Sequence, residues 1–183
     1  MHNVLVVKGI RKSFGGLVAL DDVNMGVAKG LMTMLIGPNG SGKTTLINVV
    51  SGFYRPDEGA VWFDGKEISR WPPHRVYDEG IVRTFQIPRP FQKLTILENL
   101  LTAHRGNPGE AFLRAPFRRC WVGEEEKATE MAFKFLDMLN LDHMWDRPAT
   151  HLSGGQMKLV EAGRAIMSGA KMILMDEPAS GIF

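Results

Sequence analysis

The feature that most constrains this chain is the segment 37–44, which reads Gly-Pro-Asn-Gly-Ser-Gly-Lys-Thr and matches the full pattern G-x-x-x-x-G-K-[ST]. An apolar run, 31–36, precedes it, and an amphipathic run, 43–50, follows it and ends before Gly52. This order predicts a buried strand, a glycine-rich turn and a helix in succession. The segment therefore places the chain in the α/β class with a parallel sheet.

The chemistry of this segment is phosphate binding. Glycines let the backbone curl so that successive N–H groups point inward, and the following helix adds the partial positive charge of its N-terminus. Lys43 is expected to reach the β- and γ-phosphates, and Thr44 is expected to offer its hydroxyl to Mg²⁺. A glycine-rich turn that binds nothing is the alternative, and the strand, lysine and helix around the loop disfavour it. The predicted binding residues are Gly37, Pro38, Asn39, Gly40, Ser41, Gly42, Lys43, Thr44 and Thr45.

A second predicted strand, 172–175, ends in Asp176-Glu177. Ligands of open α/β sheets collect at the carboxyl ends of strands, so Asp176 is expected to bind magnesium there. Glu177 is expected to accept a proton from the attacking water. If the Asp176-Glu177 motif stood alone, a surface turn would explain it equally well. Because the chain also carries the phosphate-binding loop 37–44, the functional interpretation is favoured.

Leu152-Ser153-Gly154-Gly155-Gln156 opens a further helical pattern, 154–168. Exposed N–H groups, a hydroxyl and a helix N-terminus make a second anion-binding arrangement. The alternative is a plain serine N-cap followed by two flexible glycines.

Taken together, these three motifs resemble the ATP-binding subunit of ABC transporters, and the resemblance covers essentially the whole chain. It implies an α/β fold: a P-loop NTPase core of ABC type with an antiparallel β layer and an inserted helical subdomain of about 88–158, all in one nucleotide-binding domain over 1–183. The residues agree with this arrangement. Apolar runs at 4–7, 23–27 and 60–63 predict the β layer, and a helix is expected over about 124–140.

The resemblance also assigns roles to single residues. Phe14 matches the aromatic position that stacks on adenine, although a buried core phenylalanine is the alternative. Gln86 matches the glutamine that contacts magnesium and the γ-phosphate and couples to the membrane subunits. Ser153 and the glycines after it would act on the nucleotide of a second copy. The resemblance therefore implies a head-to-tail dimer, of one chain or of two related chains, that holds two ATP molecules with Mg²⁺.

The stretch 83–91, together with Thr95 and Glu98-Asn99, resembles the branched-chain amino-acid uptake group more closely. The implied partners are transmembrane permease subunits and, indirectly, a solute-binding protein, and the implied location is the cytoplasmic face of the membrane. The ATPase of another polar-solute importer, such as a urea importer, remains an alternative. A nucleotide kinase is disfavoured, because it has no reason to carry the motif at 152–156. A soluble ABC ATPase is disfavoured as well, because such proteins usually carry two cassettes or a coiled coil and this sequence shows neither.

Composition excludes other classes. The net charge of +2 gives no polybasic nucleic-acid surface, and the single Cys120 cannot form an internal disulfide. The chain ends at Phe183, where the family continues with a segment that carries a histidine. We therefore expect a C-terminally incomplete cassette, and a nucleotide-binding fragment without turnover is the alternative function.

The segment 105–123 is expected to be an irregular insertion. Its aromatic residues Phe112, Phe117 and Trp121 suggest a docking surface for a membrane subunit. Its arginines, which could also contact lipid headgroups or a loop of a partner, fit an ordinary solvated face. They are Arg114, Arg118 and Arg119.

Overall fold

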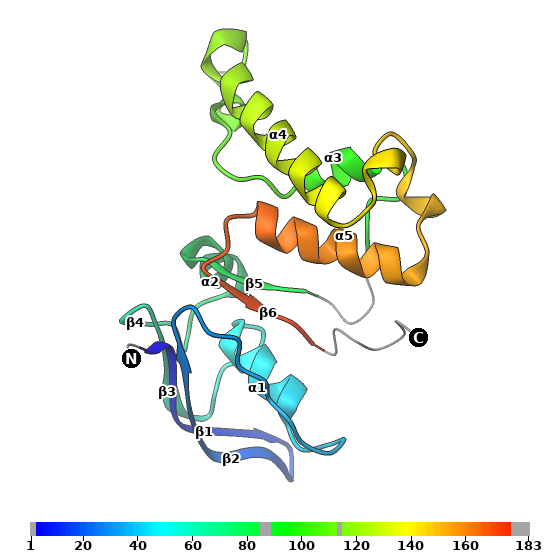
Figure 1. Cartoon of the computed structure of the whole chain (residues 1–183). Helices are drawn as coiled ribbons and strands as arrows, with labels where there is room; N and C mark the ends of the chain where they lie inside the picture. Colours follow the sequence, from blue (N-terminus) through cyan, green and yellow to red (C-terminus); the bar gives the residue numbers. More distant parts are fainter. Residues whose placement is uncertain (1–2, 85–88, 113–114, 177–183) are drawn as a thin grey trace. The chain divides into compact units, whose positions relative to one another are not determined.

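The computed structural model describes residues 3–84, 89–112 and 115–176, and it divides the chain into two units, 1–81 and 82–183 (Figure 1). Each unit has its own sheet and its own helices, so each is described by itself. Among the helices that these ranges contain, none has the length and the apolar character needed to cross a membrane.

Unit 1 is built on the predicted antiparallel β layer. Strands β1 (Asn3–Phe14) and β2 (Leu17–Ala28) form a long hairpin, and β3 (Glu58–Phe63) pairs with the other side of β1. A two-residue strand, β4 (Lys66–Glu67), completes the order β2-β1-β3-β4. The hairpin strands extend well beyond the predicted apolar runs, because backbone pairing continues where the side chains become polar.

One face of this sheet carries the core of unit 1. Side chains of β1 and β3 alternate between buried and exposed, and Ile10, Val61 and Phe63 are fully buried. Helix α1 (Lys43–Val50) contacts β2 and buries three apolar residues, and the short helix α2 (Pro73–Glu79) buries one. The buried residues of the two helices are Leu46, Val49, Val50 and Val76.

The predicted strand at 31–36 is not formed, which corrects the sequence analysis. The described backbone of this segment belongs to no strand, and its apolar side chains are exposed, with Met32 at 95% and Ile36 at 81%. A strand exists only through hydrogen bonds to a neighbouring strand. The sheet of unit 1 includes only β1 to β4, so the apolar composition of 31–36 is not sufficient to make it a strand.

Unit 2 contains a two-stranded sheet of β5 (Ile81–Arg83) and β6 (Met172–Leu174). The backbone N–H of Thr84 continues this pairing by donating to the carbonyl of Leu174 at 3.0 Å. The predicted strand at 172–175 is confirmed, but its residues are half-buried rather than buried.

Three helices pack together in unit 2: α3 (Ile96–Leu101), α4 (Val122–Met138) and α5 (Gly154–Met167). Helix α4 begins two residues before the predicted start, and it buries Ala128, Ala132 and Leu136. Short 3-10 helices, Pro108–Glu110, Arg118–Cys120, Asp142–Met144 and Ala149–His151, join the helices. The core that they share consists of Ile96, Leu100, Ala132, Leu136, Leu141, Ala149, Leu152, Val160 and Met167.

A buried amide connects the start of α3 to the chain before it. Asn99 is fully buried, and its Oδ1 accepts from the N–H of Phe91 at 2.8 Å. Its Nδ2 donates to the carbonyls of Phe91, Leu94 and Thr95 at 3.0, 3.3 and 2.9 Å. A single buried side chain therefore links backbone groups of Phe91, Leu94 and Thr95, and it supplies the partner of the Phe91 N–H.

We predict that Asn99→Ala lowers the free energy of unfolding by about 2–4 kcal/mol, because the four hydrogen bonds of this buried amide are lost and a cavity remains. Denaturant unfolding measures this loss. The exposed residue Glu126 on α4 supplies the control, since Glu126→Ala should change the stability by less than about 0.5 kcal/mol. Equal effects of the two substitutions would contradict the role of the Asn99 amide.

Candidate functional site

The loop 37–42 is curled, and its glycines make this possible. Gly40 and Gly42 have φ values of +80° and +86°, a region that residues with a side chain rarely adopt. A Cβ on Gly42 would also lie 2.6 Å from the carbonyl oxygen of Ala19 in β2. The backbone at this position therefore needs glycine both for its conformation and for the close approach to the sheet.

The ammonium group of Lys43 closes the loop. Its Nζ donates to the carbonyl oxygens of Gly37 and Pro38, each at 2.7 Å. The loop backbone therefore folds back over the first residue of α1 and places a positive charge beside its own carbonyls.

Helix α1 starts without a side-chain cap. Its N-cap residue is Gly42, and no side chain accepts a hydrogen bond from its first turn. The first N–H groups of a helix have no partner within the helix, and they carry its partial positive charge. Thr44 and Thr45 lie in this first turn, so two hydroxyls are held next to the uncapped end.

Phe14, which is predicted to stack on adenine, is the last residue of β1. Its side chain is 42% exposed, so the alternative of a buried core phenylalanine is wrong. Its ring packs edge-to-face against Tyr54, with 5.2 Å between the ring centroids. The ammonium of Lys12 lies 5.6 Å from the centroid of Phe14. The sequence analysis missed Tyr54, because a tyrosine forty residues along the chain gives no local signal of this contact.

Asp57 fixes the end of β1 that carries Phe14. Its Oδ1 accepts from Lys12 Nζ and its Oδ2 accepts from the N–H of Ser13, both at 2.6 Å. The hydrogen bond from Lys12, and then the one from Ser13, hold the pKa of the Asp57 carboxyl below its ordinary value. Sequence reasoning also missed this residue, since aspartate before a strand is common in turns.

The predicted magnesium ligand Asp176 lies two residues after β6, and Arg83 lies at the end of β5. Arg83 Nη2 donates to Asp176 Oδ2 at 3.3 Å, and both side chains are largely buried. A charge in such a place needs a partner of opposite sign, and Arg83 supplies it to the Asp176 carboxylate at the strand end. The sheet, rather than any local motif, brings these residues together.

Ser153 and Gln156 form a capping box at the start of α5. The Oγ of Ser153 accepts from the N–H of Gln156 at 3.3 Å, and Gln156 Oε1 accepts from the N–H of Ser153 at 2.9 Å. Gly154 and Gly155 have open space where a Cβ would stand, and Ser153 is exposed. The serine N-cap is confirmed, and the anion-binding role of this motif stays a prediction.

Two predicted residues, Gln86 and Glu177, lie outside the described residues. The others fall on both units: Phe14 and the loop 37–45 belong to unit 1, and 153–156 with Asp176 belong to unit 2.

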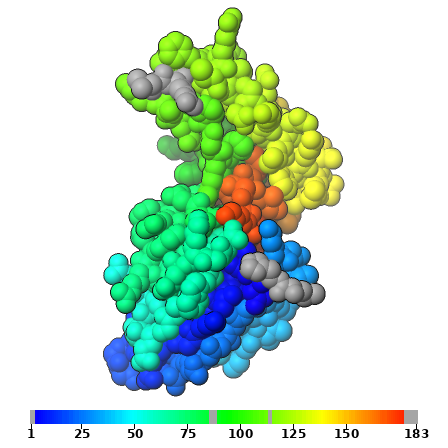
Figure 2. Space-filling model, turned by 90° about the vertical axis from the view of Figure 1, so that its left-hand side faces the viewer, coloured from blue at the N-terminus to red at the C-terminus, as the bar shows by residue number. Residues whose placement is uncertain are grey.

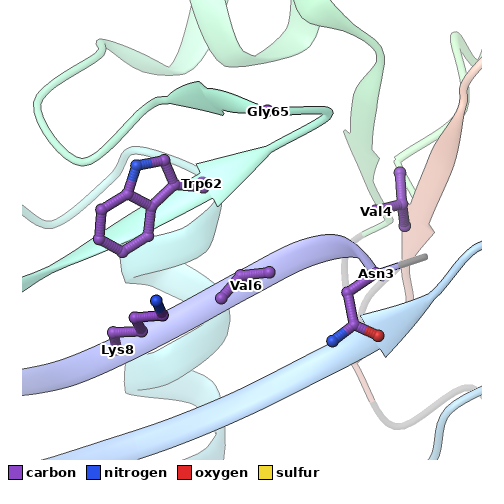
Figure 3. Close-up of a pocket in the computed structure, with 6 residues that line it drawn as sticks. All are labelled: Asn3, Val4, Val6, Lys8, Trp62 and Gly65. Atoms are coloured by element: carbon purple, nitrogen blue, oxygen red, sulfur yellow. The ribbon is translucent and has the colours of Figure 1, made fainter. Parts of the chain in front are cut away.

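A shallow hollow of about 250 Å³ lies elsewhere in unit 1, over the two inner strands β1 and β3 of the sheet and the turn that follows β3 (Figure 3). The ammonium of Lys8 lies 5.5 Å from the centroid of the Trp62 ring beside it. None of the predicted nucleotide-binding residues lines this hollow, whose walls are Asn3, Val4, Val6, Lys8, Trp62 and Gly65.

Comparison with known proteins gives the family. The family described as "ABC transporter" matches residues 20–180. The chain belongs to the ABC transporter family. The α/β P-loop cassette fold expected from the motifs is thereby confirmed, although the strand before the loop is not formed in the described part of the chain.

Individual relatives agree with this assignment. A "Probable branched-chain amino acid transport ATP-binding protein LivG" of Archaeoglobus fulgidus is 55% identical over 179 residues, which are 98% of this chain and 69% of that protein. A solved ATP-binding cassette of an ABC transporter in its ADP conformation is 51% identical with a TM-score of 0.81, and the match covers 100% of this chain and 72% of that one. A dimeric cassette in a post-hydrolysis state with ADP and Pi is 26% identical with a TM-score of 0.75, over 98% and 76% of the two chains.

We predict that Lys12→Ala moves the pKa of Asp57 up toward its ordinary value of 3.8, because the main hydrogen bond to the carboxylate is lost. The carboxyl ¹³C shift of Asp57 measures this pKa. The pKa of Asp57 is lower in the folded chain than in the unfolded chain. The contact therefore stabilises the fold at pH values above the ordinary pKa, and this contribution is lost as the pH falls through the folded pKa.

The stability that the Asp57 contact contributes should likewise decrease as the pH falls. The difference in denaturation midpoint between the unsubstituted chain and Asp57→Asn should be full at about pH 6 and should shrink below about pH 4. A difference that grows on acidification would contradict the assigned contact.

Proposed function

We propose that this chain is the ATP-binding and ATP-hydrolysing subunit of an ABC transporter that imports a small polar solute, namely branched-chain amino acids. The observation that carries the proposal is the loop 37–42 curled around the Lys43 ammonium at the uncapped start of α1. The names of the relatives support the transported class, since the ones cited above are branched-chain amino acid transport proteins or ABC cassettes.

The loop has the donors that a triphosphate requires. Phosphate oxygens accept hydrogen bonds, and the uncapped N–H groups of α1 and the Lys43 ammonium donate them. In binding, Lys43 exchanges the carbonyls of Gly37 and Pro38 for β- and γ-phosphate oxygens. The lysine therefore shapes the loop before binding and neutralises charge on the phosphates after it.

Adenine is proposed to stack on Phe14. Half-exposed aromatic rings lose solvent contact on stacking, and Tyr54 supports the Phe14 ring from its side. Asp57 acts as a positioning residue, since it holds Lys12 and the backbone of Ser13 next to this ring.

Mg²⁺ prefers hard oxygen ligands, and the Thr44 hydroxyl, the Gln86 amide oxygen and the Asp176 carboxylate fit that preference. When bound, Mg²⁺ supplies charge neutralisation at the β- and γ-phosphate oxygens. Arg83 holds the Asp176 carboxylate in place, and Glu177 next to it is proposed to take the proton of the attacking water. Gln86 is proposed to contact the magnesium shell and the γ-phosphate.

A second ATPase subunit, identical or related, is the proposed partner across the nucleotide. Ser153, Gly154, Gly155 and Gln156 would cover the phosphates held by the partner's loop, and the exposed glycine backbone at the start of α5 suits this role. The dimeric cassette with ADP and Pi shows that a related chain associates in pairs.

The helical subdomain, about 88–158, is proposed to pass the movement of the dimer to transmembrane permease subunits at the cytoplasmic face of the membrane. The solute-binding protein would then act only through those permeases. The α3–α4–α5 core gives this subdomain a rigid centre on which the movement can be carried.

We predict that Glu177→Gln lowers phosphate release at least about a hundredfold while binding of an ATP analogue is unchanged, because only the proton acceptor is removed. Release of inorganic phosphate and calorimetric binding are measured on the same preparation. Glu125→Gln, an exposed carboxylate on α4, is the matched control and should leave both unchanged.

The alternative function, a nucleotide-binding chain without turnover, predicts a different result. Binding would persist, but the unsubstituted chain would release no more phosphate than Glu177→Gln. Phosphate release that survives the substitution at full rate would contradict the role of Glu177.

A further inference from the structure

The described residues of the insertion before α4 are joined to one another by hydrogen bonds. The Asn107 side chain accepts from the N–H of Gly109 at 2.8 Å, and the N–H of Ala115 donates to the carbonyl of Ala111 at 2.9 Å. The indole N–H of Trp121 donates to the carbonyl of Ala115 at 3.0 Å. The loop is therefore closed on itself by its own backbone and one aromatic side chain.

Trp121 is the internal anchor of this loop. A Cβ on Gly109 would lie 2.9 Å from Cγ of Trp121, so the indole packs directly against the 3-10 helix Pro108–Glu110. Two of the three aromatic residues predicted as a docking surface, Phe112 and Phe117, therefore remain as exposed rings. Phe112 is 91% exposed and Phe117 is 64% exposed.

Arginines accompany these two rings. Arg118 and Arg119 form the exposed 3-10 helix next to Phe117, and neither has an ion pair among the described residues. From 111 to 123 the sequence contains three arginines and no acidic residue. The nearest glutamate of α4, Glu124, is already paired with Lys127 at 2.7 Å.

We name Phe112, Phe117, Arg118 and Arg119 the aromatic–basic patch. Within unit 2 it lies at the N-terminal end of α4, at the opposite end of that helix from α3 (Figure 1), and Figure 2 shows this segment projecting at the tip of the unit. Exposed aromatic rings that project beside cations enter the boundary between headgroups and acyl chains, while the guanidinium groups remain at the phosphates.

We propose that the aromatic–basic patch binds the surface of an anionic lipid bilayer. A fluid interface accepts two projecting rings without a matching pocket, whereas a protein partner would need a cavity shaped for each of them. The positive charge of the patch is complementary to anionic headgroups. The inference rests on the proposed function only in that a transport ATPase works beside a membrane.

Vesicle co-sedimentation of the full chain tests this proposal. The chain should bind vesicles of equal parts phosphatidylglycerol and phosphatidylcholine, should bind pure phosphatidylcholine much less, and should be released by high salt. Arg118→Gln with Arg119→Gln should raise the lipid concentration for half-binding roughly thirtyfold, at about tenfold for each 1.4 kcal/mol. Phe112→Ser with Phe117→Ser should weaken binding by at least about tenfold.

Matched controls separate the patch from general charge and apolarity. Lys29→Gln with Arg70→Gln removes two exposed positive charges from unit 1, and Met138→Gln removes an exposed apolar side chain from the other end of α4. Both controls should bind vesicles as the unsubstituted chain does. Because all of these side chains are exposed, the variants should unfold at the same denaturant concentration as the unsubstituted chain.

The proposal is overturned if the chain does not bind anionic vesicles, or if the controls lose as much binding as the patch variants. It is also overturned if the patch variants bind vesicles normally but fail to assemble with the membrane subunits, since the partner would then be a protein. Binding of an ATP analogue, measured on each variant, keeps this result distinct from a failure of the proposed function.

Discussion

Two hydrogen bonds, from the Lys43 ammonium to the carbonyls of Gly37 and Pro38, organise the loop on which the proposed function depends. They keep a positive charge inside a loop whose glycines alone can take the required backbone angles. The same loop leads into α1 without a side-chain cap, so the first N–H groups of the helix stay available. A cation, free donors and two hydroxyls are thus assembled by nine consecutive residues, before any tertiary contact is considered.

Charge on the predicted site is balanced by contacts of longer range. Arg83 compensates Asp176 across the β5–β6 pair, and Lys12 compensates Asp57 at the end of β1. In each case a carboxylate is held by a cation that lies far away in the sequence. These pairs matter less for global stability than for direction, because Arg83 fixes the proposed magnesium ligand Asp176 and Asp57 fixes the strand end that carries Phe14.

Local motifs were predictable from the sequence, and long-range pairing was not. The capping boxes at Thr95 and Ser153, and the helix that starts at Lys43, follow from residue types a few positions apart. The strand expected at 31–36 failed because its existence depends on neighbours that no local pattern specifies. Tyr54 and Asp57 were missed for the same reason, since their contacts with Phe14, Lys12 and Ser13 are made only after the sheet has formed.

The central claim is that the loop 37–45 binds a triphosphate. Titration calorimetry of the chain with MgATP and with Mg-tripolyphosphate tests this binding most directly. Lys43→Ala should weaken both ligands at least about a hundredfold, because the charge-assisted hydrogen bonds to phosphate are lost. Lys29→Ala, which removes an exposed lysine outside the loop, should leave both affinities unchanged. Undiminished binding of both ligands by Lys43→Ala would contradict the account.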